Sequence, residues 1–347
     1  MSTPPASSRP EPPKNSPPDA ASAPADTAAE APQQADDSGQ PAMDPQVKNI
    51  QPGGGIVMSI ELAWGRLRRA WLRSFFPGYV SRMQSLRQGE RGDLPFDPVD
   101  PRDVKYYRNQ ATYHWDQADD PFYWRESLPF VRVGLAELLI LGGGMLLLAV
   151  AAGWFWWPLA IGPLIVTGLI VWFFRDPARA VPDGLGTVVA PADGKLVQIE
   201  RVEDPELGVC IQFGIFLSIF NVHANRASLP GKVVAIQYRP GKFLNALRPE
   251  SAKENENLDV TVELDAGEIP GPIASRRCRI RQITGQFARR IVCWVRPGDV
   301  LKRGEMFGMI KLGSRTELLI PDDPSLRVVA KLGQKIAAGN TVLAKYE

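Results

Sequence analysis

Three short segments of the sequence carry side chains that could act together in covalent chemistry. Asp193 lies in a Pro-Ala-Asp-Gly turn, His223 follows an Ile-Phe-Asn-Val run, and Ser314 follows Gly313. An acid, an imidazole and a hydroxyl are the parts of a nucleophile that is activated by a base and an orienting carboxylate. A plainer interpretation stays open for each of them at this point: Asp193 shapes a turn, His223 packs in the core, and Ser314 caps a bend.

The three segments fall within residues 176–347, where the pattern is that of a β domain. Short runs of β-forming residues alternate with turn sequences such as Leu-Asp-Ala-Gly and Arg-Pro-Gly-Asp. Strands at this spacing predict a mainly β barrel or sandwich with little room for long helices. The expected strands span residues 187–190, 196–200, 209–219, 233–238, 260–264, 277–283, 291–295, 307–312, 327–332 and 341–345.

The segment before the β domain, residues 131–175, is dominated by an apolar run. Residues 138–174 contain no ionisable side chain, and Pro158 and a tryptophan cluster interrupt the run near its middle. A helix needs about 20 apolar residues to cross a bilayer, so the run predicts a helical hairpin, Leu138–Trp157 followed by Leu159–Phe174. The hairpin is either transmembrane or re-entrant, and a buried pair of soluble helices is the alternative.

Residues 56–130 combine a basic amphipathic helix with a polar, aromatic linker. Within 56–76, apolar residues recur at helical spacing while arginines occupy another face. Such a helix suits an anionic membrane surface, and packing against the protein itself with solvated arginines is an equal alternative. His114 lies in the linker without a second ligand or base near it in the sequence, so we expect a surface or packing residue.

Residues 1–55 are rich in proline, alanine and serine and contain no aromatic residue, which predicts a disordered tail. The formal net charge of only +2 gives no general field for binding nucleic acid. The three cysteines match no metal-binding pattern, so no metal is expected, and their odd number favours a reducing, cytoplasmic compartment.

The three reactive segments together resemble the phosphatidylserine decarboxylase family, in particular its shorter bacterial and archaeal class. The resemblance covers about residues 170–347 and leaves residues 1–130 unaccounted for. Its motifs occur in the order of the family: Phe-Phe-Arg-Asp-Pro at 173–177, Ala-Pro-Ala-Asp-Gly-Lys at 190–195, Asn-Val-His-Ala-Asn-Arg at 221–226, Tyr-Arg-Pro-Gly-Lys-Phe at 238–243, Glu-Asn-Glu-Asn at 254–257, Ala-Arg-Arg-Ile-Val at 288–292 and Lys-Leu-Gly-Ser-Arg at 311–315.

This resemblance implies a proenzyme that cleaves itself between Gly313 and Ser314. The Ser314 hydroxyl would attack the Gly313 carbonyl, with His223 as base and Asp193 orienting the imidazole. Elimination from the resulting ester and loss of ammonia would then leave a covalent pyruvoyl cofactor at position 314. The products would be chains 1–313 and 314–347, which stay together as a heterodimer.

The resemblance also implies the reaction. The pyruvoyl group would form a Schiff base with phosphatidylserine and accept electrons as CO₂ leaves, giving phosphatidylethanolamine. His223 would return a proton to the substrate. Arg226, Arg289 and Arg290 are candidates to bind the lipid phosphate, although ordinary surface ion pairs explain the last two equally well. The expected location is the cytoplasmic membrane, with the catalytic domain on the cytoplasmic side.

Two other classes of protein fit parts of the sequence. The glycine-rich turns at both ends of the β domain also resemble hybrid-barrel-like biotinyl and lipoyl domains, so a membrane-tethered carrier without decarboxylase activity is an alternative. Such a carrier needs a modifiable lysine in an exposed hairpin, and the matching stretch offers Lys311 beside Gly313 and Ser314. A soluble pyruvoyl decarboxylase is a further alternative, against which the uncharged run 138–174 argues.

Overall fold

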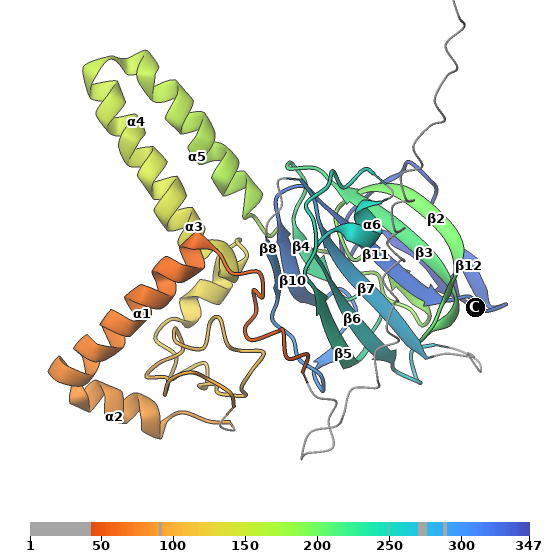
Figure 1. Ribbon diagram of the computed structural model, residues 1–347, viewed down its shortest axis with the longest axis horizontal. Helices are drawn as coiled ribbons and strands as arrows, with labels where there is room; N and C mark the ends of the chain where they lie inside the picture. Colours follow the sequence, from red (N-terminus) through yellow and green to blue (C-terminus); the bar gives the residue numbers. More distant parts are fainter. Residues whose placement is uncertain (1–42, 90–91, 249, 270–275, 287–289) are drawn as a thin grey trace, which may run out of the picture. The chain divides into compact units, whose positions relative to one another are not determined.

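The computed structural model describes residues 43–89, 92–248, 250–269, 276–286 and 290–347 (Figure 1). Most of the predicted tail, residues 1–42, lies outside the described residues. The part from Met43 to Gly55 is ordered, which corrects the predicted boundary at residue 55. Val47 and Ile50 are buried, and the Asp44 carboxylate accepts a hydrogen bond from the Tyr238 N–H at 2.8 Å. These two apolar side chains pack into the protein core. The overall composition of residues 1–55 gave no indication of this packing.

Helix α1 (Ile56–Phe75) confirms the predicted amphipathic helix, but two of its arginines are buried, which neither expectation included. Arg68 and Arg69 are buried and form ion pairs with Asp103. The apolar stripe faces outward instead, with large exposed fractions on Ile56, Ile60, Trp64, Leu67, Trp71 and Phe75. Arg68 and Arg69 are therefore neither solvated nor free to bind lipid, whereas Arg66 and Arg73 are exposed.

The chain after α1 forms a compact polar segment with little regular structure. Pro77, which has a favourable position in a first helical turn, begins α2 (Pro77–Ser85). Two short 3-10 turns follow, η1 (Tyr123–Ser127) and η2 (Arg132–Gly134). His114 is exposed, as expected, and its Nδ1 lies 2.9 Å from the Thr112 carbonyl oxygen.

The apolar run forms the predicted helical hairpin. Its first arm comprises α3 (Leu135–Glu137), η3 (Leu138–Gly142) and α4 (Gly143–Phe155), and its second comprises η4 (Trp157–Ala160) and α5 (Ile161–Phe173). The continuous stretch Arg132–Phe155, 24 residues long, is apolar and long enough to cross a membrane, and only 28% of its most apolar 18-residue window is buried. The second arm, Trp157–Phe173, is shorter. Such exposure is incompatible with a buried pair of soluble helices.

The rest of the chain is mainly β, as predicted, and contains three antiparallel sheets. The largest has eight strands in the order β13-β2-β3-β11-β7-β6-β5-β9, and the two small sheets have the orders β1-β14-β12 and β4-β10-β8. Together they enclose one large apolar core, which includes Phe213, Leu258 and Phe307. The strands are β1 (Thr187–Val189), β2 (Gly194–Asp204), β3 (Gly208–Leu217), β4 (Ala224–Arg226), β5 (Gly231–Arg239), β6 (Asn257–Leu264), β7 (Arg277–Thr284), β8 (Arg290–Cys293), β9 (Val300–Leu301), β10 (Met306–Lys311), β11 (Ser314–Pro321), β12 (Leu326–Val328), β13 (Lys335–Ile336) and β14 (Val342–Tyr346), with one short helix, α6 (Ser251–Glu254).

The fully buried strand β11 escaped the sequence pattern, as did the short strands β4, β9 and β13. Strand β11 begins Ser-Arg-Thr-Glu, which resembles a polar loop. In the fold, Arg315 donates a hydrogen bond to Glu317 on the same face at 2.8 Å, and Thr316 accepts one from Asn225 at 3.1 Å. Polar side chains can be buried when they satisfy one another in this way, which alternation of apolar residues cannot reveal.

A buried ion pair joins the base of the hairpin to the β domain. Lys311, the last residue of β10, pairs with Glu137 in α3, and its ammonium also lies 3.2 Å from the Gln51 side-chain oxygen. Nearby, the two ends of the hairpin meet, since the Val131 N–H donates to the Phe174 carbonyl at 3.0 Å. The hairpin is therefore anchored two residues before the predicted cleavage site.

Candidate active site

The predicted cleavage site lies in a two-residue connection between strands of different sheets. Strand β10 belongs to the three-stranded sheet and β11 to the eight-stranded one. Leu312 and Gly313 make the turn with φ values of 69° and 42°. This left-handed region is unfavourable for leucine, so the connection holds local backbone strain immediately before Ser314.

Ser314 is fully buried at the first position of β11, where it pairs with Leu217 of β3 and Thr284 of β7. Its hydroxyl oxygen has no hydrogen-bond partner among the described residues. A buried hydroxyl without a partner is unfavourable and calls for a functional explanation. It fits a nucleophile that is held ready beside the carbonyl group of the preceding residue.

Gly285 approaches that carbonyl group closely, a feature that the sequence did not point to. A Cβ atom added to Gly285 would lie 2.2 Å from the Gly313 oxygen and 3.1 Å from its carbonyl carbon. By contrast, a Cβ on Gly313 itself would meet no atom within 4 Å. Gly285 is therefore required by the close packing against the Gly313–Ser314 peptide, whereas there is open space at the position of a Gly313 side chain, where the positive φ favours glycine. A glycine directly after a strand was the only sequence signal for this position.

His223 is fully buried, and its ring centroid lies 4.4 Å from that of Phe173 at the end of α5. The Nδ1 atom lies 2.9 Å from the Asn221 carbonyl oxygen, so Nδ1 carries the proton that this bond requires. The Nε2 atom is then the free acceptor, and it has no partner among the described residues. Burial, together with the charge of Arg175, lowers the pKa of His223 to about 4 despite the bond to Asn221. The imidazole is thus neutral at physiological pH and available as a base.

Strand pairing brings His223 and the Ser314 region to the same end of the sheets. The Ile310 N–H donates to the His223 carbonyl at 3.2 Å, next to the pairing of Ala224 with Met309. The loop that leads to His223 starts after Leu217, which is the partner of Ser314. Two separate backbone pairings therefore bring His223 and Ser314 to the same end of the sheets, although 91 positions separate them in the sequence.

Asp193 has other partners in the structure. Its carboxylate forms an ion pair with Arg179 at 3.0 Å and accepts a hydrogen bond from the Ala338 N–H at 2.8 Å. Among the described contacts, the His223 imidazole is oriented by the Asn221 carbonyl. Among the described contacts, no hydrogen bond joins Asp193 to His223, so the predicted orienting role of Asp193 stays a prediction.

The candidate arginines for phosphate binding differ in their surroundings. Arg226 pairs with Asp176 at 2.6 Å and donates to the Gly304 carbonyl at 2.9 Å. Arg290, in β8, stands opposite Lys311 in the strand register. Arg289 lies outside the described residues. Binding of a phosphate by Arg226 would have to compete with these contacts, and both described arginines stay candidates.

Comparison with known proteins agrees with this arrangement. Residues 166–344 match the model of the family described as phosphatidylserine decarboxylase. The chain is 66% identical over 244 residues to the phosphatidylserine decarboxylase proenzyme of Rhodopirellula baltica, covering 70% of this chain and 99% of the relative. Proteins with the same description from Cupriavidus pinatubonensis and Syntrophus aciditrophicus are each 38% identical, over 65% of this chain and 96% and 99% of their own lengths.

The fold and these matches define a carboxy-lyase that is made as a precursor. The chain belongs to the phosphatidylserine decarboxylase family. The resemblance seen in the sequence is thereby confirmed, whereas the roles of individual residues stay predictions.

The Gly285 contact predicts that replacing Gly285 by alanine slows self-cleavage. The added methyl group would displace the Gly313 carbonyl, and a misplacement of about 1 Å can reduce a rate by about 10²-fold. Gel electrophoresis of freshly translated proenzyme measures the rate. Gly267→Ala is the matched control, because its nearest neighbouring atom to an added Cβ is 3.8 Å away. Cleavage of Gly285→Ala at the rate of the control would contradict the assignment.

The low pKa of His223 predicts an unusual pH profile for self-cleavage. Since the neutral form is the base, the rate should be constant from about pH 5 upward and fall only toward the pKa of about 4. An inflection near the ordinary histidine pKa of about 6.5 would show instead that the imidazole is solvated.

His223→Ala should lose about 10²–10⁴-fold in the rate of self-cleavage, because the general base is removed. His114→Ala, which removes the exposed histidine, should cleave normally.

Proposed function

We propose that this chain is a proenzyme that cleaves itself before Ser314 and then converts phosphatidylserine to phosphatidylethanolamine and CO₂. The observation that carries the proposal is the buried, unpartnered Ser314 hydroxyl after a strained turn, in a chain of the phosphatidylserine decarboxylase family. The 66% identity with a phosphatidylserine decarboxylase proenzyme extends over 99% of that relative. The chain therefore contains the counterpart of the whole relative, which supports the same reaction and the same processing.

Self-cleavage follows from the chemistry of the residues at the turn. The Ser314 Oγ attacks the Gly313 carbonyl carbon while the His223 Nε2 accepts the hydroxyl proton, and an ester replaces the peptide bond as the amine leaves. Removal of the Cα proton at position 314 then breaks the ester, leaving a carboxylate on Gly313 and dehydroalanine at 314. Addition of water with release of ammonia yields the pyruvoyl group. Asp193 would assist by stabilising the charged imidazole, which requires it to exchange its bond with Arg179.

When formed, the pyruvoyl group supplies the electron sink for decarboxylation. The residues around position 314 fit such a group, because position 314 is buried between β3 and β7, where water is excluded. His223 would hold the proton that the substrate α-carbon needs after CO₂ has left. The contact of the His223 ring with Phe173, at the end of the apolar hairpin, supports this role.

Several contacts support access for a lipid substrate from a membrane. The loop between Leu217 and His223 exposes Ile219 and Phe220, and the Phe220 carbonyl accepts hydrogen bonds at 3.0 Å from both Trp172 and Arg175. The loop is thus tied to the end of α5. We infer that the hairpin inserts into the cytoplasmic membrane and that the catalytic domain lies on its cytoplasmic side, where arginines flank the apolar run.

The alternative of a carrier domain is not favoured. A carrier must expose its modifiable lysine, whereas Lys311 is nearly buried and paired with Glu137. A hybrid-barrel-like architecture of the β domain is compatible with both readings and decides nothing between them. The burial of Lys311 therefore argues for the decarboxylase and against the carrier.

Self-cleavage predicts a small fragment that depends on Ser314. The wild-type protein should release about 4 kDa, residues 314–347, from the 38.2 kDa chain on a denaturing gel. Borohydride should raise the mass of this fragment by about 2 Da, because it reduces the pyruvoyl ketone. Ser314→Ala should stay intact and release no CO₂. A fragment that still begins at position 314 in this variant would exclude Ser314 as the nucleophile.

Membrane insertion predicts resistance to washing. The protein should stay with the bilayer fraction in both high salt and alkaline carbonate, because the apolar hairpin is held by hydrophobic burial and not by charge. Replacing Leu147 and Val150, which are exposed on α4, by aspartate should release it or block its insertion. Release of the unmodified protein by salt alone would show surface attachment only.

A further inference from the structure

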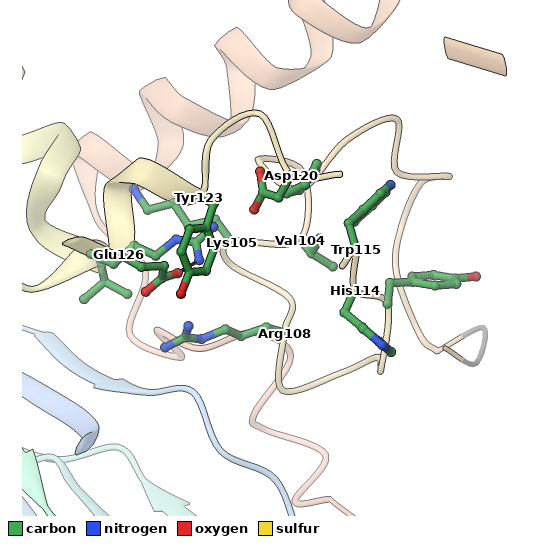
Figure 2. A pocket seen from close by; sticks show the side chains of 12 residues that line it. Val104, Lys105, Arg108, His114, Trp115, Asp120, Tyr123 and Glu126 are labelled. Atoms are coloured by element: carbon green, nitrogen blue, oxygen red, sulfur yellow. Dashed lines mark hydrogen bonds and ion pairs between the residues drawn. The ribbon is translucent and has the colours of Figure 1, made fainter. Parts of the chain in front are cut away.

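A polar cavity of about 420 Å³ lies in the segment before the hairpin, outside the residues 166–344 that match the family. Figure 2 shows its side chains, among them Lys105, Arg108, Tyr123 and Glu126. The cavity is built entirely from residues between 101 and 133. None of the steps of cleavage or decarboxylation uses it.

Arg108 is the unusual residue of this cavity. Among the described residues its guanidinium forms no ion pair or hydrogen bond, and its Nε atom is buried without a partner. The guanidinium carbon of Arg108 lies over the Trp294 ring, 4.6 Å from its centroid. Burial and the nearby charge of Arg132 lower the pKa of Arg108 to about 9. Arg108 is half-buried, and a partly buried cation without an anionic partner favours an incoming anion.

Of the other charged residues that line the cavity, the two cations have acidic partners and Asp120 is held by a backbone N–H. Lys105 pairs with Glu61 at 2.7 Å, and Arg132 pairs with Glu126. The Asp120 carboxylate accepts a hydrogen bond from the Phe122 N–H within its own turn at 2.7 Å. Lys105 and Arg132 still contribute positive charge to the walls, and Tyr123 adds a hydroxyl. This set of groups suits a phosphate, whose oxygens match the planar fork of an arginine.

The surroundings favour a lipid as the source of this phosphate. A second cavity of about 520 Å³ shares Lys105 and Arg132 with the first. Its apolar walls come from α1 and from the start of the hairpin and include Trp64, Leu138, Leu139 and Ile140. A phosphate at Arg108 would thus lie next to apolar surface that continues onto the exposed hairpin.

We propose that the cavity at Arg108 binds the phosphate group of an anionic ligand, with the headgroup of a bilayer phospholipid as its source. This site is separate from position 314. It gives residues 56–135 a role in holding the enzyme at an anionic membrane, for which the paired arginines of α1 are not available.

Binding can be measured on the full chain carrying Ser314→Ala, in neutral detergent, by calorimetric titration. The Ser314→Ala background removes cleavage and turnover, so failure of the proposed reaction cannot affect the result. Dihexanoyl phosphatidylglycerol should bind saturably, and dihexanoylglycerol, which lacks the phosphate, should not. Arg108→Gln should raise the Kd about tenfold or more through loss of charge-assisted hydrogen bonds. The matched control is Arg201→Gln, since Arg201 is an exposed arginine in the β domain.

Inorganic phosphate separates the two sources of the ligand. Competition by phosphate alone at concentrations near the lipid Kd would assign the site to soluble phosphates, and lack of competition would assign it to lipids. Arg108→Lys should bind with intermediate affinity, because it keeps the charge and loses the fork, and it serves as the test if Arg108→Gln does not fold. An unchanged Kd in folded Arg108→Gln or in Arg108→Lys, or equal affinity for dihexanoylglycerol, would overturn the proposal.

Discussion

The structure depends on the crossing from β10 to β11, where two residues carry the chain from one sheet into another. The crossing fixes Leu312 and Gly313 at positive φ and begins β11 directly at Ser314. Strand pairing on both sides of Ser314 then buries its hydroxyl, and the close approach of Gly285 fixes the Gly313 carbonyl. Strain and burial at one peptide bond are the features on which the proposed attack of Ser314 on its own backbone rests.

The same end of the β domain carries the attachment to the apolar hairpin. Phe173 contacts the His223 imidazole, and the ion pair between Lys311 and Glu137 fastens the hairpin beside the crossing. A buried ion pair adds little net stability, but it is sensitive to the loss of either partner and so defines one arrangement. The reactive groups are therefore built at the junction of the two parts, which suits a substrate that is embedded in a bilayer.

The segment from residue 56 to 135 uses its charges in an unexpected way. Arg68 and Arg69 form ion pairs with Asp103, and the apolar side of α1 is exposed to solvent. Arg108, which lines a cavity, has no such partner among the described residues. A basic amphipathic pattern thus led to two buried arginines and an exposed apolar stripe on α1, because the acidic partner Asp103 lies in the linker that follows the helix.

The sequence by itself determined the mainly β domain, the helical hairpin, the extent of α1 and the motif around Ser314, because apolar periodicity and local turn residues encode these directly. Only the tertiary structure decided which groups meet. It buried the polar strand β11, bound the His223 imidazole to the Asn221 carbonyl, paired Asp193 with Arg179 and placed Gly285 against the Gly313 carbonyl. These contacts depend on strand register, on loop conformation and on which of several charged partners is in reach, and none of these leaves a periodic signal in one sequence.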